Sequence, residues 1–519
     1  MKTANNKIWM LSIVLMAAVS CNLDRYELGQ IVYDENTPAI ETSKDLDRFE
    51  VGLMSVFRSR FQGGYFYVDD LMCDGFNAAK SYGNNFGPLH RTDEDYNASN
   101  EDVEGVWANY YLAIKNYNIA ISSVNIIADE ELRTSAKANI TKGEAFFCRA
   151  YSYLFLARHF GKVYKAATAE TDLCVPLVTV WSNNTEVKRA SNKAVYEQIL
   201  SDIDSAAFFL ANVKPVDEKG ARHIDRPTID AVQALYARYY LEVGEYAKAA
   251  EKAAALVDSK VYVLANNAKS FKEEFIEDAG KEPIMQMFAS KDEVPNGLGY
   301  YTSLFKSDGE IYWTPYYLPS GKLVDAYEEK DLRLNNWFAK VGADSYPLQL
   351  GGITVNDENI RIFTKFLGNL AYESNDYPGA HNAVKPFRIS EMYLIAAEGY
   401  CQAGDTPNAR KYLNALQSAR GATETTAELD NIKAEWFKET VGEGMRAQCL
   451  KRWGDGFTVR YAQPAAVTAN MVEVGKKNLA DRAFTAKDLY LLTFPIPNYE
   501  LKITPTLEQN EGYALSVNN

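Results

Sequence analysis

Two segments of the chain combine aromatic rings with short polar side chains, and both are too rich in Gly, Asn and Pro for a regular helix. They run from Asp74 to His90 and from Gly299 to Tyr317. A flat ring can cover the C–H face of a sugar ring, while carboxylates, amides and imidazoles bind hydroxyl groups. We predict a site for a hydroxyl-rich ligand, with Tyr82, Phe86, Tyr301, Tyr312, Trp313 and Tyr316 stacking on it and Asp74, Asn77, Asn84 and His90 hydrogen-bonding to it. The alternative for any one ring is packing beneath the loops.

No catalytic motif accompanies these segments. Carboxylates cluster at Asp69-Asp70, at Asp74 and at 93–95. A glycosidase needs two carboxylates facing each other across a cleft, which adjacency in sequence does not supply, so we interpret these residues as a solvated acidic loop. The four His residues are scattered, and HExxH, GxSxG and P-loop patterns are absent from the sequence. We therefore predict a protein that is not an enzyme and that uses no metal and no cofactor.

The N-terminus is typical of a lipoprotein signal. Lys2 and Lys7 precede an apolar stretch at 8–19 that is too short to span a bilayer. Small residues then lead to Cys21, as in a bacterial lipobox, where cleavage frees the cysteine for lipidation. We predict that acyl chains on Cys21 anchor the mature protein to a membrane. The alternative is an ordinary secretory signal with a chance cysteine.

The elements that must position the two segments are mostly helical. Apolar residues recur at helical spacing over 103–127 and 139–160, and after the expected N-cap Ser191. Residues 227–257 form the clearest unit, because small Ala residues line both halves and Gly244 separates them. This pattern predicts a tetratricopeptide-like helical hairpin, with a second one at 387–418 and a further single helix from about 431 to 453.

The long middle of the chain differs from these helices. Residues 260–385, like residues 61–100, are rich in Gly, Pro, Asn and aromatics and show weak periodicity. We predict irregular loops with short strands there, and loop regions this large inside a helical protein usually carry function. The formal net charge of −14 disfavours phosphate backbones, so we expect no nucleic-acid partner.

Several motifs, taken in order, resemble the SusD/RagB family of Bacteroidetes surface lipoproteins. They begin at the lipobox and continue to the last ten residues. The sequence departs from the family pattern at two positions: Cys148 stands where the family often has a larger apolar residue, and Glu511 where it often has Pro. The motifs are Trp107 to Asn118, Gly143 to Val163, Arg388 to Glu398, Ala409 to Gly421, Gly442-Glu443-Gly444 with Arg446, Lys451-Arg452-Trp453, Pro495-Ile496-Pro497 and Gln509 to Tyr513.

The resemblance implies a mainly α fold, a scaffold of tetratricopeptide-like hairpins with an irregular, loop-rich ligand-binding lobe. We expect residues 1–20 to be the signal peptide and 21–519 a single domain, with scaffold at about 40–260 and 386–519 and binding segments at about 61–100 and 260–385. The family implies an outer-membrane, surface-exposed lipoprotein that captures oligosaccharides for a SusC-like TonB-dependent transporter without catalysis. A peptide-binding, RagB-like protein and a tetratricopeptide-type scaffold without a small-molecule ligand remain alternatives.

Overall fold

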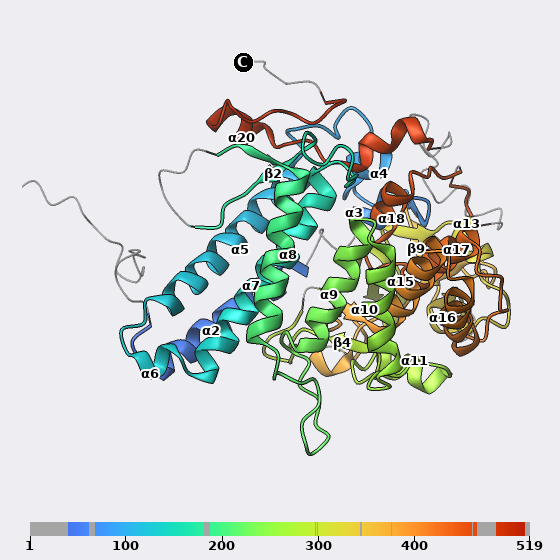
Figure 1. Cartoon of the computed structure of the whole chain (residues 1–519). Helices are drawn as coiled ribbons and strands as arrows, with labels where there is room; N and C mark the ends of the chain where they lie inside the picture. Colours follow the sequence, from blue (N-terminus) through green and yellow to red (C-terminus); the bar gives the residue numbers. More distant parts are fainter. Residues whose placement is uncertain are drawn as a thin grey trace, which may run out of the picture.

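A computed structural model describes residues 40–61, 68–180, 187–295, 297, 299–342, 345–374, 376–458, 460–463 and 484–513. The predicted signal peptide and the predicted lipidation site Cys21 lie outside the described residues. Helices dominate the described part, and the tetratricopeptide-like scaffold predicted from the sequence is confirmed. Figure 1 shows the helices side by side from α2 and α5 through α7, α8, α9 and α10 to α15, α16 and α17.

The first group of helices packs around α7. Each of its long helices begins at a capping side chain that accepts a backbone N–H of the first turn: Asn100, Ser135 and, as predicted, Ser191. Tyr110 stacks on Phe155 with ring centroids 4.1 Å apart, which joins α5 to α7. The group comprises α2 (Ser43–Arg58), α5 (Glu101–Asn125), α6 (Glu130–Arg133), α7 (Ala136–Phe160) and α8 (Asn192–Phe209).

Two helical hairpins follow, at the predicted places. They are α9 (Ile229–Glu242) with α10 (Tyr246–Asp258), and α15 (Ile389–Gln402) with α16 (Thr406–Ala419). Gly244 and Gly404 make the turns at φ 77° and 83°, a left-handed backbone that favours glycine. Small residues let α10 and α15 approach closely: a Cβ on Gly399 would lie 2.6 Å from the Tyr246 carbonyl oxygen. The hairpins therefore pack against each other as well as internally.

The prediction of a single helix from about 431 to 453 is wrong. The chain forms two helices there, α17 (Leu429–Glu439) and α18 (Arg446–Trp453). Gly442 and Gly444 between them adopt φ of 75° and 66°, and a Cβ on Gly442 would lie 2.6 Å from the Phe363 ring. The break lets Phe363, from the loop-rich middle of the chain, pack against the segment between the two helices.

The loop-rich middle contains short strands, as predicted. The paired strands are β1 (Phe76–Ala78) with β7 (Tyr317–Pro319), β2 (Leu173–Pro176) with β3 (Arg189–Ser191), β4 (Pro283–Met285) with β12 (Phe387–Arg388), and β8 (Phe338–Lys340) with β11 (Arg361–Phe363). A four-stranded sheet has the order β10-β9-β6-β5, formed by β5 (Leu304–Ser307), β6 (Glu310–Trp313), β9 (Leu348–Leu350) and β10 (Ile353–Val355). The described part also contains short helices: η1 (Ser59–Phe61), α3 (Val68–Leu71), α4 (Gly87–Arg91), α11 (Ala268–Phe275), α12 (Gly299–Thr302), α13 (Gly321–Asp325), α14 (Leu332–Asn336), η3 (Leu370–Tyr372), η5 (Ala486–Leu492) and α20 (Asn498–Ile503).

A buried network of ion pairs fixes this lobe to the helices. Glu439 of α17 accepts from Arg420 at 2.7 Å and from Arg333 at 3.0 Å, and Arg388 donates to Glu282 at 2.6 Å. All five side chains are at most 2% exposed. Burial alone would raise the pKa of Glu439, but the surrounding guanidinium groups hold it well below its usual range. Removing one partner of a buried ion pair is costly, so these pairs hold the lobe and the scaffold in one register.

Candidate functional site

Two tight hairpins build the four-stranded sheet of the lobe. Asp308 and Gly309 join β5 to β6 with φ of 51° and 85°, and Gly351 and Gly352 join β9 to β10 with φ of 57° and 81°. Positive φ at both central residues defines the turn whose twist matches that of paired strands. The Asp-Gly and Gly-Gly pairs therefore explain why this part of the irregular middle forms strands.

The two faces of this sheet differ in chemistry. Leu304, Trp313, Leu348 and Leu350 point inward and form a small hydrophobic core with Ile360 and Ile362. The Trp313 indole N–H donates to the Ser345 hydroxyl at 3.0 Å, which satisfies its one donor. Because side chains alternate along a strand, the residues between these positions face outward.

The outward face carries exposed aromatic and polar side chains. Phe305 is 53% exposed and lies opposite Tyr312 in the register of β5 and β6. Tyr316, just beyond β6, is 37% exposed, and Gln349 of β9 faces the same side as its partner Thr354. Rings of this exposure can stack on a ligand without first leaving a core.

A hollow of about 510 Å³ lies beside these side chains. We call it the sheet groove, and the described residues that line it are Ser81, Ser303, Leu304, Phe305, Thr314, Tyr316, Gln349, Gly351 and Gly352. No charged side chain occurs among these described lining residues. Hydroxyls, one amide and two exposed rings are a set that suits an uncharged ligand with many hydroxyl groups.

The structure brings the two predicted binding segments together beside this groove. β1 pairs with β7 in antiparallel register, with Asn77 opposite Leu318, and the Ala79 N–H donates to the Tyr316 carbonyl at 2.8 Å. The ring of Phe86 meets that of Tyr300 edge-on at 5.2 Å, and Tyr300 lies 5.6 Å from Tyr316. The first segment therefore supports the aromatic side of the groove.

Several predicted ligand residues lie inside the protein. The Asp74 carboxylate is fully buried and receives Arg446 at 2.8 and 2.9 Å and Lys322 at 2.6 Å. Burial alone would raise the pKa of Asp74, but Arg446 and Lys322 hold it well below its usual range. This carboxylate joins the loop before β1 to the first residue of α18 and to α13.

His90 and Asn77 act on the same loop. The Nε2 atom of His90 accepts from the Ala78 N–H at 3.3 Å, and its Nδ1 atom lies 2.7 Å from the Leu71 carbonyl oxygen. Burial and the neighbouring Arg460 guanidinium lower the pKa of His90 well below its usual value, so the ring is neutral. The Asn77 amide donates to the Tyr461 carbonyl at 3.2 Å. These side chains satisfy backbone groups around the groove.

The remaining predicted residues are divided between the core and the surface. Tyr301 is 1% exposed and packs on Phe76 with ring centroids 4.3 Å apart. Tyr82 and Phe86 are buried, whereas Asn84 is exposed and accepts from the Tyr82 hydroxyl at 3.1 Å. Tyr312 donates to Glu310 at 2.6 Å. Among the ten predicted residues, Tyr316 lines the groove, and contact of the others with a ligand stays a prediction.

The interpretation of the carboxylate cluster as a solvated loop is wrong for its first members. Asp69 and Asp70 are 2% and 3% exposed. Asp69 lies 3.0 Å from the His159 Nε2 atom, and the Asp70 carboxylate accepts the Gly444 N–H at 3.0 Å. Burial, with Asp69 nearby, raises the pKa of Asp70 to about 7. These residues hold α3 against α7 and the break between α17 and α18.

Sequence reasoning missed Phe305, Gln349 and the hydroxyls of Ser81 and Ser303. The signals for the first two were an Asp-Gly pair flanked by apolar and aromatic residues at 304–313 and a Gly-Gly pair flanked by alternating apolar residues at 348–355. Ser81 and Ser303 carry no comparable signal, because only the folded chain brings them to the groove.

In the part of the chain that the structure describes, no group of three or more His, Cys, Asp or Glu side chains is arranged to hold a metal ion. None of the helices in the same part has the length and apolar character needed to cross a membrane.

Comparison with known proteins identifies relatives of this chain. A family described as "Starch-binding associating with outer membrane" matches residues 34–241, and the SusD family matches residues 233–513. SusD-like protein P2 of Formosa agariphila is 26% identical over 61% of this chain and 62% of that relative's length.

Solved structures share the fold. A SusD superfamily protein of Bacteroides thetaiotaomicron superposes with a TM-score of 0.72 at 23% identity, over 90% of this chain and 99% of that one. The surface glycan-binding protein A of Bacteroides fluxus gives a TM-score of 0.68 at 21% identity, over 91% and 100%. At these identities the likeness establishes the architecture alone.

Proposed function

Because the chain belongs to the SusD/RagB family, we propose that it captures neutral oligosaccharides in the sheet groove at the cell surface. The observation that carries this proposal is the groove itself, where two exposed rings, an amide and several hydroxyls surround a hollow with an uncharged lining. A relative of the same fold is named as a surface glycan-binding protein, which supports a saccharide ligand.

The size and openness of the groove fit an oligosaccharide better than a single sugar. A hollow of about 510 Å³ exceeds the volume of one pyranose ring, and Phe305 and Tyr316 offer two separate stacking faces. Phe305 comes from β5 and Tyr316 from the segment after β6, so consecutive sugar units could contact different elements. Backbone at Gly351 and Gly352 would border the ligand without side chains in the way.

We propose that the protein binds the oligosaccharide without cleaving it. A glycosidase needs one carboxylate as acid and another as base or nucleophile beside the bond. Two carboxylates of the cluster noted in the sequence are engaged elsewhere: Asp74 with Arg446 and Lys322, and Asp70 with the Gly444 N–H. We propose that the bound oligosaccharide passes intact to a SusC-like TonB-dependent transporter, and that lipidation of Cys21 keeps the protein at the outer membrane.

The test is binding and product analysis against a panel. Purified protein is mixed with neutral oligosaccharides of several linkages and with peptides, and the mixtures are examined by calorimetry and by chromatography for cleavage. Saturable binding of one neutral glycan class without cleavage is expected. Binding of peptides in preference to every glycan, or cleavage of any glycan, would contradict the proposal.

The transporter partnership has its own test. Affinity-tagged protein is purified from its native outer membrane in mild detergent, and co-purifying proteins are identified by mass spectrometry. A TonB-dependent barrel in stoichiometric amount is expected. Recovery of the tagged chain without such a barrel would contradict the delivery step and leave glycan capture to be judged by the panel.

A further inference from the structure

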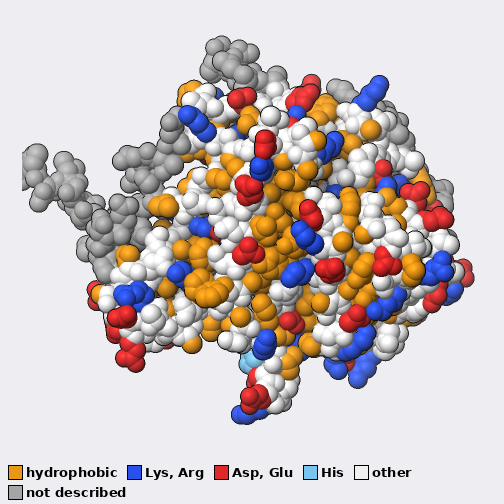
Figure 2. Space-filling model, in the orientation of Figure 1, with side chains coloured by type: hydrophobic (Ala, Val, Ile, Leu, Met, Phe, Trp, Pro, Cys, Tyr) orange, Lys and Arg blue, Asp and Glu red, His pale blue; other side chains and the backbone are white. Residues whose placement is uncertain are grey.

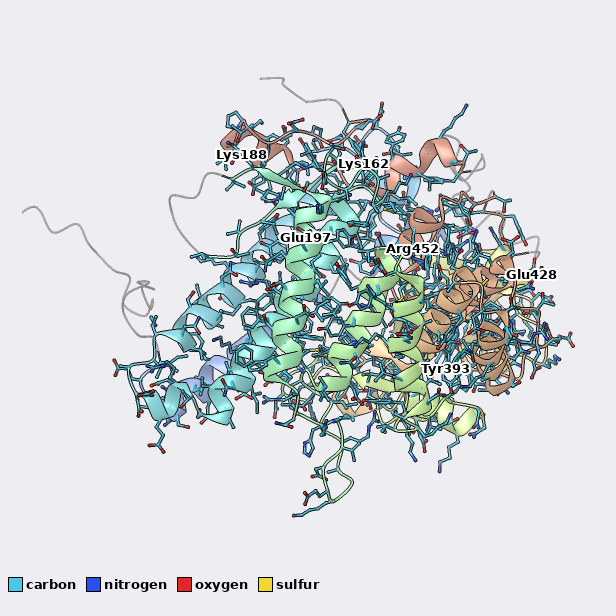
Figure 3. All side chains as sticks on the ribbon, viewed as in Figure 1. Lys162, Lys188, Glu197, Tyr393, Glu428 and Arg452 are labelled. Atoms are coloured by element: carbon cyan, nitrogen blue, oxygen red, sulfur yellow. The ribbon has the colours of Figure 1, made fainter. Side chains whose placement is uncertain are left out.

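A second hollow, of about 400 Å³, lies away from the sheet groove. We call it the basic cleft, and four parts of the chain form it: the loop after α7, the end of α18, the region of η5, and the segment at 510–511. Figure 3 places Lys162 in the upper part of the molecule and Arg452 below it, nearer the middle. Figure 2 shows, in the same orientation, hydrophobic side chains along the middle of the molecule. Three motifs that resemble the family converge in this cleft, although the proposed glycan groove uses none of them.

Lys451 is the unusual residue of the basic cleft. It is 7% exposed, and its ammonium donates to the carbonyl oxygens of Arg158 at 2.6 Å and Gly161 at 2.8 Å. These carbonyls end α7, so the cation caps that helix. An ammonium has three donors, and in the described part of the chain the hydrogen bonds of this one go to backbone carbonyls rather than to a carboxylate. Burial lowers the pKa of Lys451 to about 7, and the attraction of the Glu242 and Asp69 carboxylates offsets only part of that effect.

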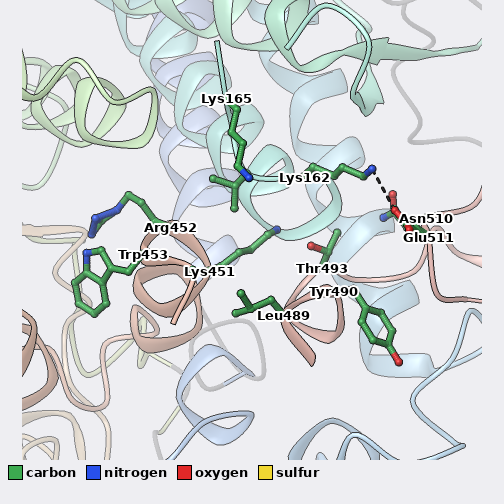
Figure 4. Close-up of a pocket in the computed structure, with 12 residues that line it drawn as sticks. Lys162, Lys165, Lys451, Arg452, Trp453, Leu489, Tyr490, Thr493, Asn510 and Glu511 are labelled. Atoms are coloured by element: carbon green, nitrogen blue, oxygen red, sulfur yellow. Dashed lines mark ion pairs between the residues drawn. The ribbon is translucent and has the colours of Figure 1, made fainter. Parts of the chain in front are cut away.

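Further positive charge lies around Lys451. Figure 4 shows Lys165 and Lys451 extending toward the same space, with Thr493 beside them. Lys165 is exposed and has no ion-pair partner among the residues that the structure describes. Lys162 pairs with Glu511 at 3.3 Å, and Glu511 is 82% exposed at the edge of the cleft. A concentration of cations is notable in a chain whose formal net charge is −14.

The rest of the lining is largely apolar. Val163 and Leu489 are half-buried, and Tyr490 is 44% exposed. Arg452 is already neutralised by Glu398 at 2.6 Å, so it does not compete for a ligand charge. Apolar surface next to unpaired ammonium groups suits a ligand that carries an acid on a compact C–H-rich body.

We propose that the basic cleft binds an anionic saccharide unit, with its carboxylate or sulfate between Lys165 and Lys451 and its ring against Leu489 and Tyr490. Glu511, one of the two departures from the family pattern, competes with the ligand for Lys162. The choice of a saccharide as carrier rests on the proposed function, whereas anion binding in the cleft does not. The site is separate from the sheet groove, so the protein would hold neutral and acidic sugars at different places.

The experiment uses trigalacturonate as the probe and calorimetry at low ionic strength as the readout. Lys165→Gln should weaken binding about fivefold, the scale of a partly exposed ion pair. Glu511→Gln should strengthen it by a similar factor, because Lys162 loses the nearer of its two carboxylates, at 3.3 Å, and keeps Asp172 at 3.8 Å. Matched controls for net charge are Lys340→Gln and Glu358→Gln, both exposed and away from the cleft. Lys451 is left intact in these variants, because its loss would also remove the cap of α7.

The outcomes separate the parts of the proposal. Opposite shifts in the two cleft variants, with unchanged controls, are expected, and maltotriose should not compete. Absence of trigalacturonate binding at millimolar concentration, or equal affinities in cleft and control variants, would overturn the site. Equal binding of inorganic sulfate, or tighter binding of an acetylated dipeptide with a free carboxylate, would overturn the saccharide assignment. Neutral glycans bind at the sheet groove in the proposed function, so their binding is measured separately and does not decide this result.

Discussion

Replacing Asp74 by Asn removes the negative charge that holds the loop between α3 and β1 against α18. The carboxylate is fully buried and makes a two-pronged contact with Arg446, at 2.8 and 2.9 Å, and a third contact with Lys322. Arg446 is 13% exposed and Lys322 27%, so the first cation cannot reach water easily while the second can. The substitution leaves one buried guanidinium without its counter-charge.

The size of the effect follows from this geometry. Removing one partner of a buried ion pair costs about 3–5 kcal/mol, and we expect about 3 because Asn still accepts a hydrogen bond and Lys322 can turn outward. Asp376→Asn is the control: that carboxylate is 76% exposed and pairs with a surface lysine, so its loss should cost under about 1 kcal/mol. Urea denaturation followed by tryptophan fluorescence at pH 7 measures both.

The pH dependence makes the test sharper. The folded-state pKa of Asp74 is depressed below its unfolded value, so its contribution is fully present above the unfolded pKa of about 4 and is lost as the pH falls toward the folded pKa. The gap between wild type and Asp74→Asn should therefore narrow from pH 5 to pH 3. An unchanged denaturation midpoint at pH 7, together with weakened glycan binding, would refute this structural role and restore the direct ligand contact predicted from the sequence.

Two further predictions concern the groove and its supporting loop. Gly351→Ala places a side chain at φ 57°, so it should lower the free energy of unfolding by about 1 kcal/mol and weaken glycan binding. Gly52→Ala in helix α2 is the control and should leave stability unchanged or raise it. Equal shifts of the thermal midpoint in the two variants would contradict the turn assignment. Asp70→Asn should raise the thermal midpoint at pH 8 but not at pH 4. Burial raises the pKa of Asp70 to about 7, so the wild type loses stability as the pH rises from about 4 to about 7, and the variant does not. A difference in midpoint that does not change with pH would contradict this prediction.

The scaffold could be predicted from the sequence because its signals are local. Gly244 between two Ala-lined stretches specifies the α9–α10 hairpin, and Ser191 specifies the start of α8. Sequence analysis missed the break between α17 and α18, because Gly442 acquires its role from the Phe363 ring, which is distant in sequence. Helical periodicity alone continues through such a break.

The candidate site was harder to predict because burial is a tertiary property. Asp74 and His90 have the side chains of ligand-binding residues, yet Arg446 and Arg460 arrive from late in the chain to enclose them. The predicted segments do lie together, but the side of the sheet that Phe305 occupies follows from the strand register, which the sequence signals only through its turn pairs. The composition of the loops thus indicated which segments lie at the candidate site, but not which of their side chains line the groove.

The central claim is that the outward face of the sheet binds a neutral oligosaccharide. Phe305→Ala with Tyr316→Ala removes both exposed rings, and Phe208→Ala on α8, 77% exposed, is the control. Stacking on both rings would take on the order of 90 Å² of apolar surface from water, worth about 2 kcal/mol, or roughly a thirtyfold rise in Kd. Calorimetry of the three proteins with the best neutral oligosaccharide of the panel should show that loss only in the double variant. Equal affinity in the double variant and the wild type would contradict the account.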